Sequence, residues 1–462
     1  MYKNIGYFSD VQNLSFVNAY AIAQAFTQLL HQSTRDTFKW PQSGHRPMSM
    51  RDAWSIPEFR RLLIGNGVNM LGSSIFIIGM SWTVAQIGGP KIFGLIWTAY
   101  FLGHLPLLLY GGMVVDRMPR RTVALVADLA QAVLVALAIV ALLAGLDEIK
   151  TLLVVTFLTG GAGAFSIPAI GALVPDLVEE ELLPQANAMR GVAMTAAWML
   201  GPLIGGFTVG TWGIEACLFI DVITFLFSGA VLWTISEVEV VRDDAGDLRE
   251  EVVEAWAFVK TQPWLFAGIL MFMIWHIGDS AIEIGVPFII ENKGLGANEY
   301  GLFGAVGALG AMVGSVLGGI RPIPKEVRGK VFYIFIGGIA WCMLMWAMPI
   351  PFWVILVFVL LEGVLGGTLG VIWRTTMSDS VDQHLRGRVN SLDAIGSLIF
   401  IPFAPILGGA MIEATNVLTT YSIAVAFMVL TTTAGLIVPS FRRFERIEHE
   451  DFPITPDQSP SG

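Results

Sequence analysis

Long apolar runs recur along the whole sequence, and each has roughly 20 residues or more, enough to cross about 30 Å of hydrocarbon. Only 14% of the 462 residues are charged, whereas about 25% is usual in a soluble domain. Because lipid offers no hydrogen bonds to the backbone, an α-helix is the expected form of each run. The sequence therefore predicts an all-α membrane protein with twelve transmembrane helices, at 60–88, 92–115, 122–146, 151–175, 184–210, 215–236, 263–291, 297–320, 329–349, 351–377, 384–412 and 417–441.

The distribution of Lys and Arg predicts how these spans are oriented. With twelve spans, all but three of the 27 Lys and Arg residues fall on one side, and the exceptions are Lys91, Lys150 and Lys293. Cytoplasmic loops carry the excess of positive charge in membrane proteins. We therefore expect a multi-pass membrane protein with both termini cytoplasmic.

Hydrophilic segments divide the chain into five parts. The longest interruption, 237–262, is expected to be a central cytoplasmic loop between two six-helix halves, 51–236 and 263–441. Residues 1–50 read as an N-terminal extension, either disordered or read from a start codon upstream of the true one. The charged, Pro- and Ser-containing stretch 442–462 is expected to be a disordered cytoplasmic tail.

The two halves repeat each other at a constant spacing. Four pairs of identical residues are each 203 positions apart: Asp176 and Asp379, Asn187 and Asn390, Pro202 and Pro405, Gly205 and Gly408. Parallel six-span repeats of this kind are a known plan of secondary transporters, which bind substrate between the repeats near the middle of the membrane.

A dense group of charges separates the second span from the third. Residues 111–121 read GGMVVDRMPRR, and this stretch resembles the G-G-x-x-x-D-R-x-x-R-R loop signature of the major facilitator superfamily. The resemblance covers about residues 50–441 and implies a conformational gate that latches the two halves on the cytoplasmic side. The alternative is an ordinary positive-inside turn, which the three arginines alone would satisfy. The predicted gate residues are Gly111, Gly112, Asp116, Arg117, Arg120 and Arg121.

Span five carries a second resemblance. The stretch from Ala197 to Gly206 is similar to the family's antiporter signature G-x-x-x-G-P-x-x-G-G, with Ala in place of the first Gly. That signature is associated with export. An ordinary proline kink is the alternative reading, and close-packed glycines are compatible with both. The predicted hinge residues are Gly201, Pro202, Gly205 and Gly206, with their counterparts Pro405, Gly408 and Gly409.

Other stretches resemble particular exporters within that family. The stretches 165–188 and 386–390 are similar to twelve-span drug, macrolide and siderophore exporters of the drug:proton antiporter type, including macrolide efflux proteins, tetracycline-type pumps and the enterobactin exporter. This resemblance implies a location in the inner membrane of a bacterium. Many drug–proton antiporters have an Arg within span four. Span 151–175 has none, so that route of proton coupling is not expected here.

Acidic side chains within the spans are the main candidates for coupling. A charge at mid-bilayer costs roughly 2.5–3.5 kcal/mol on insertion scales, so such residues face water or partners. His276, Asp279 and Glu283 are spaced to share one helical face, and Glu362 lies midway along span ten. Neighbouring carboxylates repel, so one of them is expected to hold a proton, as proton-driven exchange requires. For Glu283 the alternative is a solvated position near the outer surface.

Other polar residues within the spans have less specific roles. Asp128 and Asp393 lie near cytoplasmic ends and are expected to pair with nearby arginines, and Asp221 is expected to be structural or interfacial. The remaining candidates for contact with substrate or protons are Asn66, Asn69 and His104.

Other functional classes are not indicated. The sequence has no phosphate-binding G-x-x-x-x-G-K-[ST] loop, no Cys/His cluster with metal-ligand spacing and no G-x-S-x-G motif. We therefore expect no enzymatic activity, cofactor, metal or nucleic-acid partner.

The partners expected instead are a small-molecule substrate, protons and the lipid bilayer, with the chain acting as a monomer. The predicted function is proton-coupled export of amphipathic molecules, such as drugs or siderophore-like metabolites, by alternating access. Two alternatives remain: an uncoupled facilitator or lipid-type flippase, and a transport-inactive membrane sensor or assembly partner.

Overall fold

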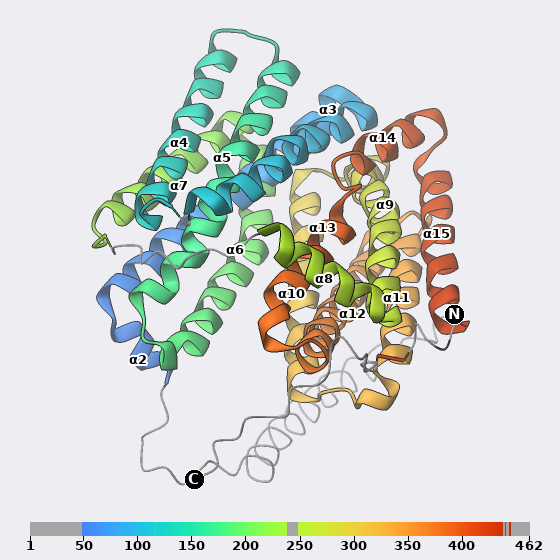
Figure 1. The fold of residues 1–462 in the computed structure, drawn as a ribbon. Helices are drawn as coiled ribbons and strands as arrows, with labels where there is room; N and C mark the ends of the chain where they lie inside the picture. Colours follow the sequence, from blue (N-terminus) through green and yellow to red (C-terminus); the bar gives the residue numbers. More distant parts are fainter. Residues whose placement is uncertain (1–48, 116, 238–247, 438, 440–442, 445–462) are drawn as a thin grey trace, which may run out of the picture. The chain divides into compact units, whose positions relative to one another are not determined.

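The computed structural model describes residues 49–115, 117–237, 248–437, 439 and 443–444, and the described secondary structure is entirely helical. The helices are α2 (Met50–Ser55), α3 (Pro57–Val115), α4 (Arg120–Leu143), α5 (Glu148–Leu177), η1 (Glu180–Leu182), α6 (Leu183–Trp212), α7 (Ile214–Trp233), α8 (Leu248–Thr261), α9 (Pro263–Asn292), α10 (Ala297–Ile320), α11 (Lys325–Trp346), α12 (Phe352–Ser380), α13 (Gln383–Leu398), α14 (Ala404–Ala414) and α15 (Val417–Ile437) (Figure 1).

These helices supply the twelve predicted spans, although ten are individually long and apolar enough to cross a membrane. The 59-residue helix α3 contains two spans, because Gly89 interrupts it with a φ of 70°. Only glycine adopts that conformation easily, and Pro90 then begins the second span.

The eleventh span differs from the prediction of one continuous helix over 384–412. It consists of α13 and α14, separated by a turn at 399–403. Pro402 and Pro405 explain the break, since neither has a backbone N–H to donate and each disfavours helical geometry in the residue before it.

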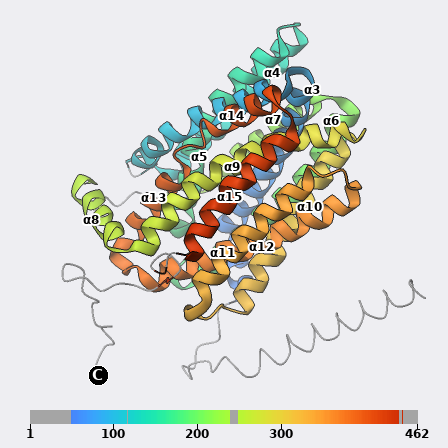
Figure 2. The ribbon, with the colours of Figure 1, turned by 90° about the vertical axis from the view of Figure 1, so that its right-hand side faces the viewer.

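A helix also lies in the segment predicted as the central loop. Helix α8 has buried residues Ala255, Phe258 and Val259 on one side, and it packs against α13 and α9 (Figure 2). Arg388 of α13 binds Glu254 of α8 at 2.8 Å, so this helix is fastened to the second half of the chain.

The two halves repeat the same packing scheme. In the first half α4 packs against α5 and α7, and in the second half the corresponding α11 packs against α12 and α15. Likewise, the contact of α3 with α5 corresponds to that of α10 with α12. The internal sequence repeat therefore has a counterpart in three dimensions, as expected for parallel repeats.

Two helix pairs make the main contacts between the halves, α6 with α10 and α3 with α14, and α3 also touches α9 and α10 (Figure 1). Each of the two main contacts depends on glycines that let backbones touch. Gly206 lies against the carbonyl of Ala297, and Gly409 lies against the carbonyl of Pro90. Pro90 follows the kink of α3, and Ala297 is the first residue of α10. Both lie at the end of the helices opposite the 111–121 loop, so these contacts hold that end together.

Substitution of Gly206 by alanine should weaken this contact. The added Cβ would overlap backbone atoms of α10, which cannot rotate away, and overpacking of this kind costs about 1–3 kcal/mol. We expect Gly206→Ala to lower the thermal unfolding midpoint of the purified protein. Gly191→Ala on the same helix is the control, because nothing lies within 4 Å of its new Cβ. Equal midpoints for the two variants would contradict the assigned contact.

Candidate functional site

Three carboxylates of the second half form one electrostatic group. Asp279 and Glu283 lie four residues apart on α9, which places them on one face. Glu362 comes from α12. Asp279 interacts electrostatically with both Glu283 and Glu362, and Glu362 interacts with Glu283. The structure therefore brings together acids that are about 80 residues apart in the sequence.

The side chains of the acid group are only partly covered by the protein. The Glu283 side chain is exposed although its neighbours Ile282 and Ile284 are buried, and Asp279 and Glu362 are partly exposed. Access of water to these positions would let the carboxyl groups gain and lose protons. In the described part of the chain, no Lys or Arg contributes to the electrostatics of the three acids, so protons or a cationic ligand are the available counter-charges.

Two tyrosines border the acid group. Tyr300 of α10 and Tyr421 of α15 both interact electrostatically with Glu283. Tyr421 also donates a hydrogen bond to the carbonyl of Ile282. The Tyr300 ring lies 5.8 Å from the ring of Trp82, which belongs to α3 in the first half. The acids therefore stand where the two halves face each other.

The remaining predicted contact residues lie in different surroundings. His276 is partly buried one turn before Asp279, with its Nδ1 2.7 Å from the carbonyl oxygen of Phe272. His104 is buried between α3 and α5, with Nδ1 2.9 Å from the carbonyl oxygen of Gly160.

The two asparagines of α3 also have local partners. Asn66 is partly buried, and its Nδ2 lies 3.6 Å from the sulfur of Met70. Asn69 is buried within the first half, where its Nδ2 donates to Asp128. Neither asparagine is brought to the acid group by a described contact.

The expectation that Asp128 and Asp393 pair with arginines is wrong for the partners that the structure describes. Asp128 accepts hydrogen bonds from Asn69 and two serines. Asp393 accepts from the indole Nε1 of Trp373 at 2.8 Å and from Ser397 at 3.2 Å. Neutral donors of this kind stabilise the charged form of a carboxylate in part.

The loop at 111–121 is anchored within the first half. Gly111 is buried against the carbonyl of Ala164 on α5, and Arg120 binds Asp176 at the end of that helix. Arg117 is exposed, and the Arg121 guanidinium lies 5.7 Å from the ring centre of Trp233.

The two other predicted gate residues, Gly112 and Asp116, have no described contact that anchors the loop. Gly112 is half-buried, and nothing lies within 4 Å of a Cβ placed on it. Asp116 lies outside the described residues.

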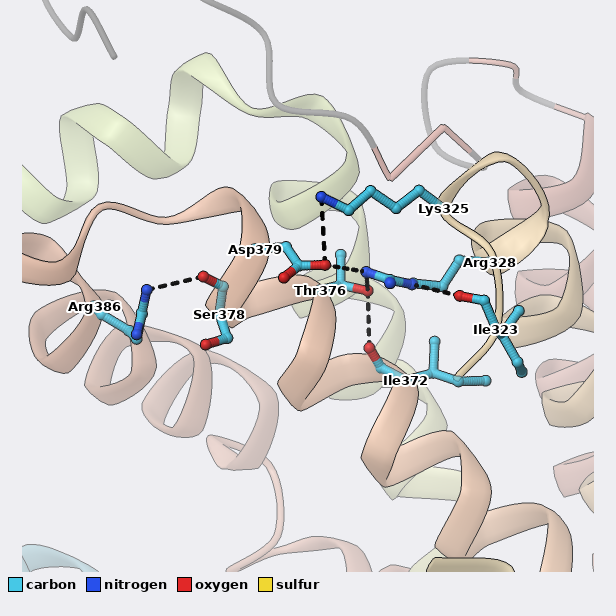
Figure 3. Close-up of polar contacts among 8 residues, drawn as sticks. All are labelled: Ile323, Lys325, Arg328, Ile372, Thr376, Ser378, Asp379 and Arg386. Atoms are coloured by element: carbon cyan, nitrogen blue, oxygen red, sulfur yellow. Dashed lines mark hydrogen bonds and ion pairs between the residues drawn. The ribbon is translucent and has the colours of Figure 1, made fainter. Parts of the chain in front are cut away.

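An equivalent ionic contact occurs in the second half (Figure 3). Arg328 at the start of α11 binds Asp379 near the end of α12 at 3.0 Å, and Lys325 approaches the same oxygen at 3.6 Å. Arg328 also donates to Thr376. Each half therefore has an Arg–Asp pair in the same structural position, and Asp176 and Asp379 are the acids that repeat 203 residues apart.

The predicted hinge residues lie at the contacts between and within the halves. All are buried: Gly201, Pro202, Gly205, Gly206, Pro405, Gly408 and Gly409. Gly301 of α10 touches the carbonyl of Pro202, and Gly94 touches the carbonyl of Pro405. Gly408 lies against Ala281, which is two residues from each acid of α9 and therefore on the opposite side of that helix. This contact joins α14 to the helix that carries two of the acids.

Sequence reasoning missed several residues of the site. Tyr300 and Tyr421 gave no signal, because a tyrosine in an apolar run is usual in a membrane helix. Lys325, Arg328 and Asp379 were not expected to interact. The repeat spacing of the two aspartates was the one signal that could have identified the second ionic pair.

Comparisons with known proteins agree with this architecture. The sequence profile of the Major Facilitator Superfamily matches residues 62–401. The chain is 26% identical over 403 residues to the multidrug efflux pump Tap of Mycolicibacterium fortuitum, covering 81% of this chain and 94% of the pump. It is 22% identical to the enterobactin exporter EntS of Shigella boydii, covering 82% of this chain and 87% of that exporter.

A shorter match is to macrolide efflux protein A of Streptococcus pyogenes, with 25% identity, 48% of this chain and 56% of that protein. Among solved structures, a D-xylose–proton symporter aligns with a TM-score of 0.68 at 14% identity, over 84% of this chain and 99% of the symporter. The nucleoside transporter NupG also aligns at 0.68, with 11% identity, over 82% of this chain and 98% of NupG. The chain is therefore a multi-pass membrane protein that belongs to the Major Facilitator Superfamily.

Proposed function

We propose that this protein is a secondary active exporter that exchanges protons for amphipathic organic molecules by alternating access. The observation that carries the proposal is the acid group of Asp279, Glu283 and Glu362, which is only partly covered by the protein and faces the other half. Carboxylates held together in this way cannot all be ionised cheaply. One proton bound by the group could therefore be exchanged for a substrate, most simply a cationic one.

The conformational cycle follows from the contacts between the halves. The distribution of Lys and Arg supports a cytoplasmic position for the 111–121 loop and for both termini. With this orientation, the glycine contacts of Gly206 and Gly409 would close the outer side, and this state would face inward. Export would require those contacts to separate while the cytoplasmic ends approach each other, with the 111–121 loop latching the halves.

The substrate class rests on the relatives. Their names describe a multidrug pump, a macrolide efflux protein and an enterobactin exporter, and all three kinds of cargo are organic molecules moved outward. The aromatic side chains of Trp82 and Tyr300 beside the acid group would suit an amphipathic molecule, whose ring could stack while its charged part faces a carboxylate.

The alternatives make different demands on the same residues. An uncoupled facilitator or flippase has no use for a proton at the acid group, so it would tolerate neutral amides there. A transport-inactive sensor or assembly partner would keep its role when the halves are cross-linked. The gathering of three acids from two helices favours the coupled exporter.

Substitution of the acid group should impair transport. In sealed proteoliposomes with an imposed pH gradient, Glu362→Gln and Asp279→Asn should each reduce gradient-driven movement of an amphipathic dye at least about tenfold. An amide has the size of the acid but cannot release a proton. Exchange of labelled for unlabelled dye without a gradient should be retained, since it needs no net proton movement.

The matched control is Glu413→Gln, which neutralises an exposed acid near the end of α14, away from the acid group. It should leave gradient-driven transport unchanged. Full gradient-driven transport by both acid-group variants would contradict proton coupling at this site and favour the facilitator.

The ionic pair of Arg328 and Asp379 in the second half should stabilise the fold. Arg328 is largely buried, with 7% of its side chain exposed, and Asp379 is 33% exposed. Asp379→Asn removes the charge that Arg328 faces, and loss of a partner at such a site costs about 1–3 kcal/mol. We expect a lower thermal unfolding midpoint for this variant, measured in detergent.

Glu326→Gln is the control for this substitution. Glu326 is an exposed acid in the first turn of α11, two residues from Arg328, and its loss should leave the midpoint within about 1 °C of the wild type. A midpoint for Asp379→Asn that equals this control would mean that the pair does not stabilise the fold.

A further inference from the structure

A buried polar cluster in the first half is separate from the acid group of α9 and α12. Four helices that meet in this half contribute to it: α3, α4, α5 and α7. We call it the α3–α7 cluster, and its members are Asn69, Ser73, Asp128, Ser166, Asp221 and Ser228.

Asp128 is the centre of this cluster. Its side chain is fully buried, and both of its oxygens accept hydrogen bonds. The Oδ1 atom accepts from Ser166 at 2.9 Å. The Oδ2 atom accepts from Ser228 at 2.7 Å and from the Nδ2 of Asn69 at 3.3 Å. Three neutral donors from three helices thus converge on one carboxylate.

Asp221 is the second acid, and it has fewer partners. It is 1% exposed, and its Oδ1 accepts one hydrogen bond from Ser73 at 3.3 Å. Ser73 follows Asn69 by four residues on α3, about 6 Å along the axis. The two acids therefore lie about one helical turn apart, and they interact electrostatically with each other.

The cluster lacks a positive charge. The groups that act on Asp128 are Ser166, Ser228 and Asn69, and those that act on Asp221 are Ser73 and Asp128. Another titratable neighbour of Asp221 is the thiol of Cys217, one turn earlier on α7, and it has no positive form. Two buried carboxylates that repel each other need at least one compensating positive charge, because buried charges are paired, protonated or bound to a cation.

An unpartnered oxygen within the cluster points to the same requirement. Asn69 is 7% exposed, and its Oδ1 has no hydrogen-bond partner among the described residues. A buried acceptor without a partner is costly. Its carboxamide lies beside Asp128, and a half-turn of that group would replace the long 3.3 Å hydrogen bond from Nδ2 by an oxygen that faces the carboxylate. The two oxygens could then hold a cation between them, and the ion would take the place of the lost hydrogen bond.

We propose that the α3–α7 cluster binds one monovalent cation, Na⁺ or H⁺, between Asp128 and the carboxamide of Asn69, with Asp221 supplying the second negative charge. Carboxylate, amide and hydroxyl oxygens are the ligands that hard cations prefer. The cluster offers one such oxygen from every member. A single positive charge satisfies the orphaned oxygen of Asn69 and removes the repulsion between the two acids. This site is independent of the acid group and of the proposed proton exchange there.

Binding of the cation can be measured on the purified full-length protein. The thermal unfolding midpoint is followed as Na⁺ replaces choline at constant ionic strength, and equilibrium binding of radioactive Na⁺ is measured in parallel. For sodium, we expect saturable binding of one ion per chain and a rise in the midpoint of about 3 °C or more at saturation. Proton release on raising the pH, measured without Na⁺, is the second arm.

Variants assign the binding to the cluster. Asp128→Asn should abolish Na⁺ binding and its effect on the midpoint, and Asp221→Asn should weaken both at least about tenfold. The control is Asp393→Asn, another largely enclosed acid that accepts hydrogen bonds from neutral donors, and it should keep wild-type Na⁺ binding. If the bound ion is a proton, Na⁺ should not bind and should not change the unfolding midpoint. Raising the pH should then release one more proton from the wild type than from Asp221→Asn.

The wild type alone decides whether Na⁺ binds, and whichever of Asp128→Asn and Asp221→Asn folds decides whether a proton is held by the cluster. Saturable sodium binding, or a cluster-dependent proton, supports a cation site and identifies the ion. The proposal is overturned if the wild type shows neither a Na⁺-dependent midpoint nor a proton that is lost when one of the two aspartates is replaced. Sodium binding that survives Asp128→Asn would also overturn it, because the ion would then lie elsewhere.

Discussion

The cost of an uncompensated negative charge in a medium of low polarity governs the arrangement of this molecule. Each carboxylate within the spans is either hydrated, hydrogen-bonded or paired with a cation. Asp176 and Asp379 bind arginines at helix ends, and Asp128 and Asp393 accept hydrogen bonds from neutral donors. The acids of α9 and α12 have neither an arginine nor a hydrogen-bond donor as a partner among the described residues. They are only partly covered by the protein and interact with one another, which is why we assign exchangeable protons to them.

Glycine contacts between the halves link the acid group to the movement of one half against the other. The halves touch through backbones at Gly206, Gly301 and Gly409, and such contacts are extensive without being held by side chains. Gly409 of α14 lies against Pro90 of the first half, and its neighbour Gly408 lies against Ala281 of α9. Helix α14 therefore connects a contact between the halves to the helix that carries two of the acids. Alternating access needs a connection of this kind.

The architecture could be predicted from the sequence to a large extent, because length and hydropathy determine what can cross a membrane. The family and the exporter-like relatives were also predicted, from the loop at 111–121 and the glycines around Pro202. The break at 399–403 was missed, although Pro402 and Pro405 could have indicated it. Side-chain partners were less predictable. Periodicity places Asp128 on a helix, but it cannot show that serines from two other helices meet it, since that depends on how the helices rotate against each other.

The central claim is that substrate and protons move in opposite directions through one protein. The most direct test is to load proteoliposomes with a pH-sensitive dye, impose a substrate gradient without any pH gradient, and record the internal pH. Our account predicts that protons move against the substrate. Entry of substrate should raise the internal pH, exit of substrate should lower it, and neither change should occur in Glu362→Gln. Substrate movement with a constant internal pH would contradict it.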